Sequence, residues 1–536
     1  MKKKLLSILL ATAMVLSVAA CGNEDTPAGN DGSSAAGNDT QQSGEVEEFE
    51  LTSLKIMVDG TLNLTEETGL NEFEAAWEAA VGVDLVIDKP DHSGYADALA
   101  RALAKTSDRP DVVLMPAAMY AQYAAFDGVL WDMTSAYENA DFYDRMTRAN
   151  VNQANYINGK LLGFSPAAGN GCLTYVKQTW LDAVGMSVDD IKTYDDFITL
   201  LTKFSTEDPD GNGVNGDTYG VIAAGIISNE APWTNYLPEF WQSAQPAFVQ
   251  DDNGVWIDGF QTEETKAALE RLRSAWAAGL IDPDTSLFYG ETKKTREKWF
   301  GADQTGSAGC FSYWAGTWHE TLANNLAKNG LDNNIAELNL IAEMEGFVDR
   351  KAPVWVILDD GDGNDARENA IWEAFFETMM DGDKVQTMWM YGVEDVHWTT
   401  KAGTVTLNAG TEKEKSTTYE EGQFHMLPTL TDPNSLYKKN HIDNLLAIAP
   451  LTNGFGALSD IVDASNAHFV ANAIPAPNTP SSETYSTQGS IVKDAVLVAV
   501  TSVVKDGVSY EDAMATYRES CQSVVDTILS ELNAAE

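Results

Sequence analysis

From residue 51 onward the chain alternates short apolar runs with amphipathic stretches, and this alternation limits the folds open to it. Residues 54–58, 83–87 and 112–115 have the length and apolar character of buried strands. Two helical patterns separate them: Leu70, Phe73 and Trp77 recur along one face, and Tyr95, Leu99 and Leu103 along another. This β-α-β-α-β order predicts an α/β fold with a mostly parallel sheet flanked by helices. Ligands of such sheets bind at the carboxyl ends of strands, here near residues 59–60 and 116–120.

The alternation returns further along the chain. The patterns predict helices over 265–280 and 368–380, a strand over 354–358, and two closing helices around 490–505 and 510–533. Residues 401–422 read as an exposed hairpin, because turn residues and charges follow a β-branched run. A chain of 536 residues is long enough for a large two-lobed body.

The N-terminus has the pattern of a targeting signal. Three lysines precede an apolar run at 5–18, which is too short to span a bilayer and fits the core of a signal peptide. Ala19, Ala20 and Cys21 follow, and this sequence resembles the lipobox of bacterial lipoproteins. The resemblance implies a signal peptide over 1–20, lipid on the thiol of Cys21 and a polar tether over 21–49. An ordinary secretory signal with a coincidental cysteine is the alternative.

Composition excludes several classes of function. With 34 Lys+Arg against 81 Asp+Glu, no segment of the mature chain offers the basic stripe that nucleic acid or anionic lipid would need. The same charge disfavours polyanionic glycans, although a local arginine such as Arg101 or Arg350 could override it. No other stretch approaches eighteen uncharged apolar residues, so we expect no membrane span in the mature chain. The three cysteines after Cys21 form no C-x-x-C pair and read as buried thiols.

Catalytic motifs are missing from the sequence. It contains no G-x-S-x-G, H-E-x-x-H or P-loop, and its six histidines show no i, i+4 pairing. Carboxylate pairs arise by chance among so many acids. We therefore expect a protein that is not an enzyme and has no organic cofactor.

One acidic loop resembles a calcium site. Oxygen-bearing side chains stand at positions 1, 3 and 5, a glycine at 6 and a backbone carbonyl at 7, as in the first half of a Ca²⁺-binding loop. The candidate ligands are Asp208, Asp210, Asn212, the carbonyl of Val214, and Asp217. Position 12 is a tyrosine, so the usual bidentate Glu is missing, and Asp217 would have to replace it. A simple Asn/Gly-rich turn is the alternative. The G-x-G-x-x-G pattern inside this loop follows a helix and is ringed by acids, which argues against a nucleotide site.

Fourteen tryptophans raise the question of what they contact. A flat aromatic ring packs well against the apolar C–H face of a sugar. The tryptophans on predicted helix faces, such as Trp77, Trp276 and Trp372, are expected in the core. Others lie in Pro/Gly/Ser-flanked segments and are candidates to line a cleft: Trp314, Trp318, Trp233, Trp241 and Trp398. Polar candidates are Tyr120, Asn170, Glu394 and Asp395, with solvated surface as the alternative for each.

The order of several motifs is similar to that of the family 1 extracellular solute-binding proteins of ABC importers. Five segments carry the resemblance over the mature chain: 109–113, 158–166, 175–185, 309–318 and 391–398. Leu162 stands where the family usually has an aromatic residue, and Gln178 stands where Asp is common.

The resemblance implies two α/β lobes, joined by chain crossings, that close over a saccharide. Lobe 1 would comprise 50–165 plus 352–400, and lobe 2 would comprise 166–351 plus 401–536. The expected function is capture of a neutral oligosaccharide and its delivery to an ABC permease, by a monomer anchored on the extracytoplasmic face of the membrane. A surface-anchored carbohydrate hydrolase and a glycan-binding adhesin are the alternatives.

Overall fold

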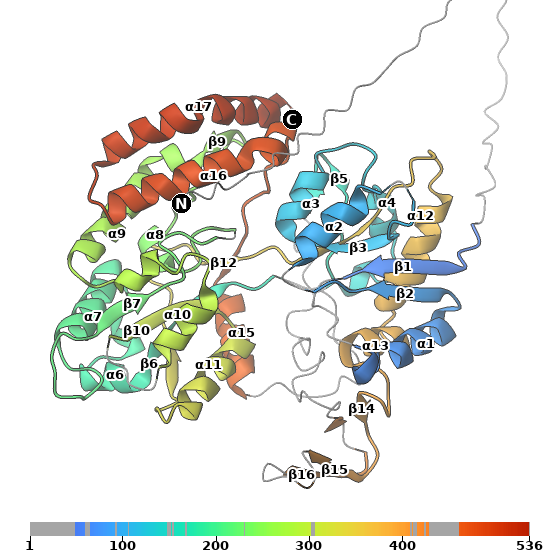
Figure 1. Cartoon of the computed structure of the whole chain (residues 1–536), viewed down its shortest axis with the longest axis horizontal. Helices are drawn as coiled ribbons and strands as arrows, with labels where there is room; N and C mark the ends of the chain where they lie inside the picture. Colours follow the sequence, from blue (N-terminus) through green and yellow to red (C-terminus); the bar gives the residue numbers. More distant parts are fainter. Residues whose placement is uncertain are drawn as a thin grey trace, which may run out of the picture. The chain divides into compact units, whose positions relative to one another are not determined.

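Two four-stranded sheets organise the computed structural model of the chain (Figure 1). Apolar clusters pack on both faces of the first sheet, and one larger apolar cluster surrounds the second. The structure describes residues 49–58, 65–91, 94–105, 107–146, 152, 155–166, 169–229, 231–301, 306–407, 410, 415–422, 425–427 and 460–534. The predicted signal peptide, Cys21 and the tether up to residue 48 lie outside the described residues.

The first sheet has the strand order β13-β3-β1-β2. Strand β1 (Ser53–Met57) pairs in parallel with β2 (Asp84–Asp88) and β3 (Val112–Met115), whereas β13 (Val354–Ile357) runs antiparallel to β3. Helices α1 (Leu70–Val81) and α2 (Tyr95–Leu103) connect the parallel strands. The predicted β-α-β-α-β order and the mostly parallel sheet are confirmed here.

Helices on both sides bury the first sheet. The predicted helix at 368–380 forms as α12 (Ala366–Ile371), continued by a π-helical segment, η7 (Trp372–Glu377). Trp77 and Trp372 are buried in this core, as the helix-face pattern predicts.

The second sheet has the order β11-β6-β10-β7. Strand β10 (Ala308–Trp314) pairs in parallel with β7 (Tyr219–Ile222) but antiparallel with β6 (Cys172–Lys177), which pairs antiparallel with β11 (Ile335–Glu337). The sheet is therefore mixed, not mostly parallel as the sequence pattern suggests. Strand β6 follows the segment of chain that leaves the first core. It begins at the edge of the second sheet where β7 and β10 end.

Long helices cover the second sheet. Helix α9 (Glu263–Ala277) packs against α16 (Glu483–Val504), which pairs with α17 (Tyr510–Ala534) as Figure 1 shows. Helix α16 is long and apolar enough to cross a membrane by length and composition. However, one of its faces, including Val496, Val500 and Val503, is buried in the second core. The three cysteines of the described chain are buried free thiols, as predicted.

The remaining helices and strands are shorter and include the predicted hairpin, whose two strands pair from Gly403 to Leu407. They are α3 (Ala117–Tyr123), α4 (Thr134–Glu138), β4 (Tyr156–Ile157), β5 (Lys160–Leu161), α6 (Gln178–Ala183), α7 (Tyr194–Thr206), α8 (Pro238–Trp241), β8 (Phe248–Gln250), β9 (Trp256–Asp258), α10 (Thr292–Trp299), α11 (Thr317–Lys328), β12 (Phe347–Asp349), α13 (Lys384–Tyr391), β14 (Trp398–Thr399), β15 (Gly403–Leu407), β16 (Lys415–Tyr419), β17 (His425–Met426), α15 (Asp460–Ala471) and β18 (Ala473–Pro475).

Two crossing segments between the cores lie side by side. The backbone N–H groups of Phe164 and Trp355 donate to each other's carbonyl oxygens, and the N–H of Arg350 donates to the carbonyl of Asn170 at 3.2 Å. A Cβ placed on Gly169 would lie 1.3 Å from the carbonyl oxygen of Arg350, so only glycine allows this approach. The lobe boundaries that the sequence places at 165–166, 351–352 and 400–401 stay a prediction.

Candidate functional site

The carboxyl end of β10 meets the amino end of β6, where Trp314 is paired with Cys172. Gly316 then turns the chain into α11 with a φ of 72°. A Cβ at Gly316 would lie 2.2 Å from Oδ1 of Asn466, so glycine is required by both backbone conformation and space. Its N–H donates to the hydroxyl of Ser465 at 2.8 Å. This turn fixes Trp314 and Trp318 at one edge of the sheet.

An aromatic cluster forms at this edge, and we use that name for Tyr236, Phe311, Tyr313, Trp314 and Trp318. Tyr313 lies at its centre: its ring stacks with Phe311 at 5.3 Å and Tyr236 at 6.3 Å between centroids. Trp318 meets Tyr313 edge-on at 4.7 Å, and Trp314 lies 6.2 Å away. The structure therefore brings together Trp314 and Trp318, two of the tryptophans that the sequence singled out.

Cations cover rings of this region. The guanidinium of Arg296 lies 4.7 Å from the ring centre of Trp318 and 5.0 Å from that of Tyr313. The guanidinium of Arg350, on the second crossing segment, lies 4.2 Å from the ring centre of Trp314. These distances are those of cation–π interactions.

Asn170 lies beside the aromatic cluster on the first crossing segment. Its side-chain amide donates to the carbonyl of Ala315 at 3.2 Å and accepts from the N–H of Gly171 at 2.9 Å. Asn170 thus connects the crossing to the chain between Trp314 and Gly316.

Trp233 is partly buried against the second core and has a positive φ of 66°. Its backbone carbonyl accepts from the N–H of Ser228 at 2.7 Å. The ammonium of Lys493 on α16 lies 4.6 Å from its ring centre. No ring contact among the described residues joins Trp233 to the aromatic cluster.

Three other candidates are buried in cores. Trp241 is fully buried, and its indole N–H donates to the carbonyl of Ile226 at 3.1 Å. Trp398 is buried and donates in the same way to Gly392 at 2.9 Å. The hydroxyl of Tyr120 donates to the carbonyl of Asn155, and burial raises its pKa. No ring contact among the described residues joins these three side chains to the aromatic cluster, so we leave them out of the candidate site.

Glu394 and Asp395 lie together beside β14, and no contact among the described residues joins them to the aromatic cluster. The carboxylate of Asp395 accepts from the hydroxyl of Thr399 at 2.9 Å and pairs with Lys401. The hydrogen bonds from Lys401 and Thr399 lower the pKa of Asp395. These contacts give Asp395 a local role in the turn between α13 and β14.

The loop between α7 and β7 contains the predicted calcium ligands. The side-chain amide of Asn212 donates to the carboxylates of Asp210, at 3.1 Å, and Asp217, at 2.8 Å. The carboxylate of Asp208 accepts from the backbone N–H groups of Asn212 and Gly213. Burial and the neighbouring carboxylates of Asp208 and Asp217 raise the pKa of Asp210. Val214 is exposed on the same loop.

One atom of this loop suits a cation. Oδ1 of Asp217 is buried and accepts no hydrogen bond from any residue that the structure describes. Two carboxylates also converge on the single amide of Asn212, which can rotate to present its oxygen instead. The residues therefore fit a hard, oxygen-preferring ion such as Ca²⁺.

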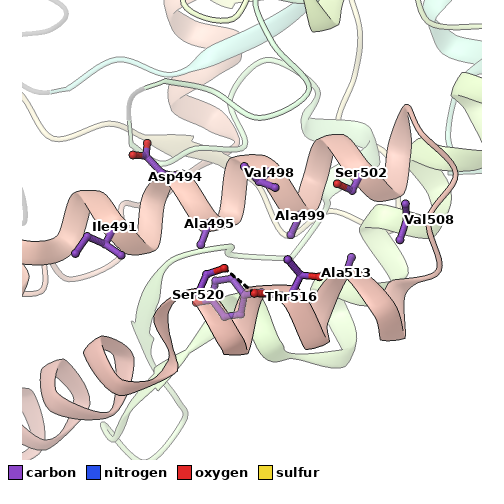
Figure 2. A pocket seen from close by; sticks show the side chains of 11 residues that line it. Ile491, Asp494, Ala495, Val498, Ala499, Ser502, Val508, Ala513, Thr516 and Ser520 are labelled. Carbon is purple, nitrogen blue, oxygen red and sulfur yellow. Dashed lines mark hydrogen bonds between the residues drawn. The ribbon is translucent and has the colours of Figure 1, made fainter. Parts of the chain in front are cut away.

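A groove of about 440 Å³ lies between α16 and α17. Figure 2 shows that small side chains, including Ala495, Ala499, Ala513 and Thr516, line it. The single charged side chain on its wall is that of Asp494. Because small and aliphatic side chains dominate its lining, with Tyr517 as the one aromatic residue among those that line it, we assign no ligand to it.

Sequence reasoning missed Arg296 and Tyr313 as members of the site. Arg296 lies in a helix rich in lysine and arginine, where a charged residue reads as solvated surface. Tyr313 occupies a buried strand, where an aromatic residue reads as core. The segment 309–318 did carry a signal, because it contains Trp314 and Trp318, whose rings the structure brings onto Tyr313.

Known proteins resemble this chain in sequence over part of its length and in structure over most of it. No family model matches the chain. It is 29% identical over 167 residues to "Lipoprotein LipO" of Bacillus subtilis (strain 168), which covers 30% of this chain. The chain spans about a third of the length of this curated relative, 31%.

Solved structures match over nearly the whole chain. An HMO-binding, ABC-transporter-associated solute-binding protein from Bifidobacterium longum infantis aligns with a TM-score of 0.59 and 14% identity, covering 90% of this chain and 98% of that one. The Streptococcus pneumoniae substrate-binding protein FusA, as an EF-hand mutant in complex with fructo-nystose, aligns with a TM-score of 0.53 and 13% identity, covering 90% and 99%. The chain therefore has the solute-binding-protein fold.

Proposed function

We propose that this chain is a lipid-anchored extracytoplasmic solute-binding protein that captures an oligosaccharide and delivers it to an ABC permease. The observation that carries the proposal is the aromatic cluster, placed beside two chain crossings in a solute-binding-protein fold. Flat rings bind the C–H faces of sugars, and neighbouring polar groups bind their hydroxyls. The structural relatives named above are described as sugar-binding transport proteins, which supports the same conclusion.

The ligand site lies at the aromatic cluster, where Trp318 is the partly exposed ring and the other four rings are buried. Asn170 is its polar neighbour, and Trp233 is a further partly exposed ring that we include in the proposed site. The crossing at Asn170 and Arg350 contacts this cluster, so binding there can bias how the crossings bend. Lobe closure is then the signal that the permease recognises. The lipid on Cys21 and the polar tether keep the protein near the permease.

A titration of the mature chain with a panel of oligosaccharides tests this function. Tryptophan fluorescence should shift saturably at one equivalent of one class of sugar, and mass spectrometry should recover that sugar intact. Recovery of a shortened sugar would establish a hydrolase. A saturable shift without a ligand-dependent change in small-angle scattering would favour an adhesin.

Calcium has a structural role in this proposal, held by Asp208, Asp210, Asn212, the carbonyl of Val214, and Asp217. A bound ion would satisfy the buried oxygen of Asp217 and relieve repulsion among the carboxylates. At a hundredfold excess over Kd, binding stabilises the folded chain by about 2.7 kcal/mol.

Thermal unfolding with Ca²⁺ and with chelator tests the ion. The Tm of the wild type should rise with Ca²⁺, and that of Asp217→Asn should not. Asp251→Asn provides a matched control, because Asp251 caps an exposed turn between β8 and β9 without converging carboxylates. Equal Tm values of the wild type in Ca²⁺ and in chelator would refute the site.

A further inference from the structure

The basic side chains of α10 divide into two kinds. Three lysines each lie within ion-pair distance of a carboxylate: Lys293 at 3.7 Å from Glu297, Lys294 at 3.1 Å from Glu291, and Lys298 at 2.7 and 2.6 Å from Asp282 and Asp284. Arg296 forms no ion pair with any residue that the structure describes, although carboxylates lie close by on its own helix. Its guanidinium lies on the rings of Tyr313 and Trp318 instead.

Most of the hydrogen-bonding capacity of Arg296 is unused. A guanidinium has five N–H donors in a rigid fork. Within the described chain, Arg296 donates once, to the hydroxyl of Tyr313. The side chain is only partly buried, so the other donors are open to a ligand.

Arg271 shows how a structural arginine behaves in the same core. It also lies near a ring, 5.8 Å from that of Tyr194. It donates, however, to the carbonyls of Phe240 at 2.8 Å and Trp241 at 3.4 Å, where α8 ends. Its donors satisfy backbone acceptors, which those of Arg296 do not.

A second guanidinium extends the cationic character of the site. Arg350 covers Trp314, whose ring lies 6.2 Å from that of Tyr313. The cluster is thus flanked by Arg296 on α10 and Arg350 on the crossing segment. The chain carries 81 acidic against 34 basic residues, so cations gathered on a ligand site run against its overall charge. Such local cations attract an anion that the rest of the surface repels.

We propose that the captured saccharide is acidic, and that Arg296 binds a uronate carboxylate through its free fork. This inference rests on the proposed function and replaces the neutral oligosaccharide expected from net charge. The rings of Tyr313 and Trp318 hold the guanidinium in place, so less conformational entropy is lost when the carboxylate binds. Arg350 contributes a second positive charge from the crossing, next to Trp314.

Matched ligand pairs test the proposal by calorimetry on the mature chain. The probes are oligomers of galacturonate, glucuronate and mannuronate, each beside its carboxyl-reduced neutral counterpart of equal length and linkage. We expect at least one acidic oligomer to bind about 10- to 100-fold tighter than its reduced partner, as for loss of a charge-assisted bidentate contact. The preference should shrink as NaCl rises from 50 to 500 mM.

Three variants test whether the preference for acidic oligomers comes from the guanidinium of Arg296. Arg296→Gln should remove the preference, because the affinity for the acidic oligomer should fall at least fivefold more than the affinity for its neutral counterpart, and Arg296→Lys should restore only part of the preference. Lys294→Gln, on the same helix, is the control and should change neither affinity. Thermal unfolding of each variant checks that the fold is intact.

The outcomes separate the two proposals. Neutral oligomers binding as tightly as acidic ones, or an unchanged preference in Arg296→Gln, overturn the acidic ligand and leave oligosaccharide capture standing. Failure of every acidic and neutral oligomer, across these probes and the panel proposed above, overturns both.

Discussion

Aromatic side chains are used differently around the two sheets. In the first core, rings pack on rings: Phe164 contacts Tyr137, Phe142, Trp372 and Phe376 at centroid distances of 5.5 to 5.9 Å. In the second, many rings meet a cation, and every cation–π contact among the described residues lies on an aromatic ring of that core or its margin. The contacts of a tryptophan ring therefore decide whether we place the residue in a core or in the candidate site. The presence of a tryptophan in the sequence does not decide this.

Polar contacts also distinguish the second region. Glu337 on β11 joins two helices: its carboxylate accepts from Nδ1 of His319 on α11 at 2.8 Å and of His468 on α15 at 3.0 Å. His319 follows Trp318 directly, so this network supports the helix that carries the aromatic cluster. A largely buried carboxylate with two histidine donors therefore helps to hold the second region together.

The largest effect on stability is expected in the core of the first sheet. Phe164→Ala removes a fully buried ring that contacts four others, and we expect the free energy of unfolding to fall by about 3–5 kcal/mol. Urea unfolding followed by circular dichroism measures it. Ligand affinity, measured where the variant is folded, should change little. A fall in unfolding free energy of less than about 1 kcal/mol would show that the rings of this core pack loosely. That result would contradict the contrast between the two regions.

Glu337→Gln tests the polar side of the comparison. Burial alone would raise the pKa of Glu337, but hydrogen bonds from His319, His468 and Ser465 bring it down to about 2, from an ordinary value of 4.5. A depressed pKa stabilises the fold above the unfolded value, and that contribution is lost as pH falls from about 4.5 to 2. At about 1.4 kcal/mol per pH unit, it amounts to about 3 kcal/mol at pH 7.

Urea unfolding of the wild type and Glu337→Gln between pH 7 and pH 3 provides the measurement. The difference in unfolding free energy should be about 3 kcal/mol at pH 7 and should narrow steadily below pH 4.5. Glu343→Gln is a control on an exposed carboxylate that accepts from the backbone N–H of Tyr194. A difference that stays constant with pH would mean that packing, and not the ionised carboxylate, accounts for the effect.

The sequence predicted the first sheet better than the second for a physical reason. Periodicity identified β1, β2 and β3 and the helices between them, because each element follows the last along the chain. In the second sheet, strand direction depends on where β6 enters from the crossing, and no local pattern encodes that. The predicted mostly parallel arrangement therefore did not extend to it.

The candidate site was predictable only in part. Trp314 and Trp318 lie close together in a motif-like stretch, so the sequence singled out both, and the structure brings both rings onto Tyr313. Trp241 and Trp398 have similar flanking residues, yet their indole N–H groups are buried against backbone carbonyls. Arg296 joins the site from a helix that precedes β10, and only folding brings it onto Trp318. Contacts between separate elements decide these assignments, and a single sequence does not display them.

The smallest effect tests whether a ring under a cation contributes to binding or only to folding. Trp318→Leu keeps an apolar side chain but removes the aromatic ring beneath Arg296. The guanidinium then loses a cation–π contact, and the sugar loses one aromatic surface. We expect affinity for the captured saccharide to fall by about 1–2 kcal/mol and the unfolding free energy to change by less than about 1 kcal/mol, because the ring is only partly buried. Trp276→Leu on α9 is the matched control, a partly buried tryptophan outside the cluster, and calorimetry measures both variants. If Trp318→Leu costs stability and leaves affinity unchanged, its ring is a packing element like those around Phe164, and the contrast between the two regions fails at that residue.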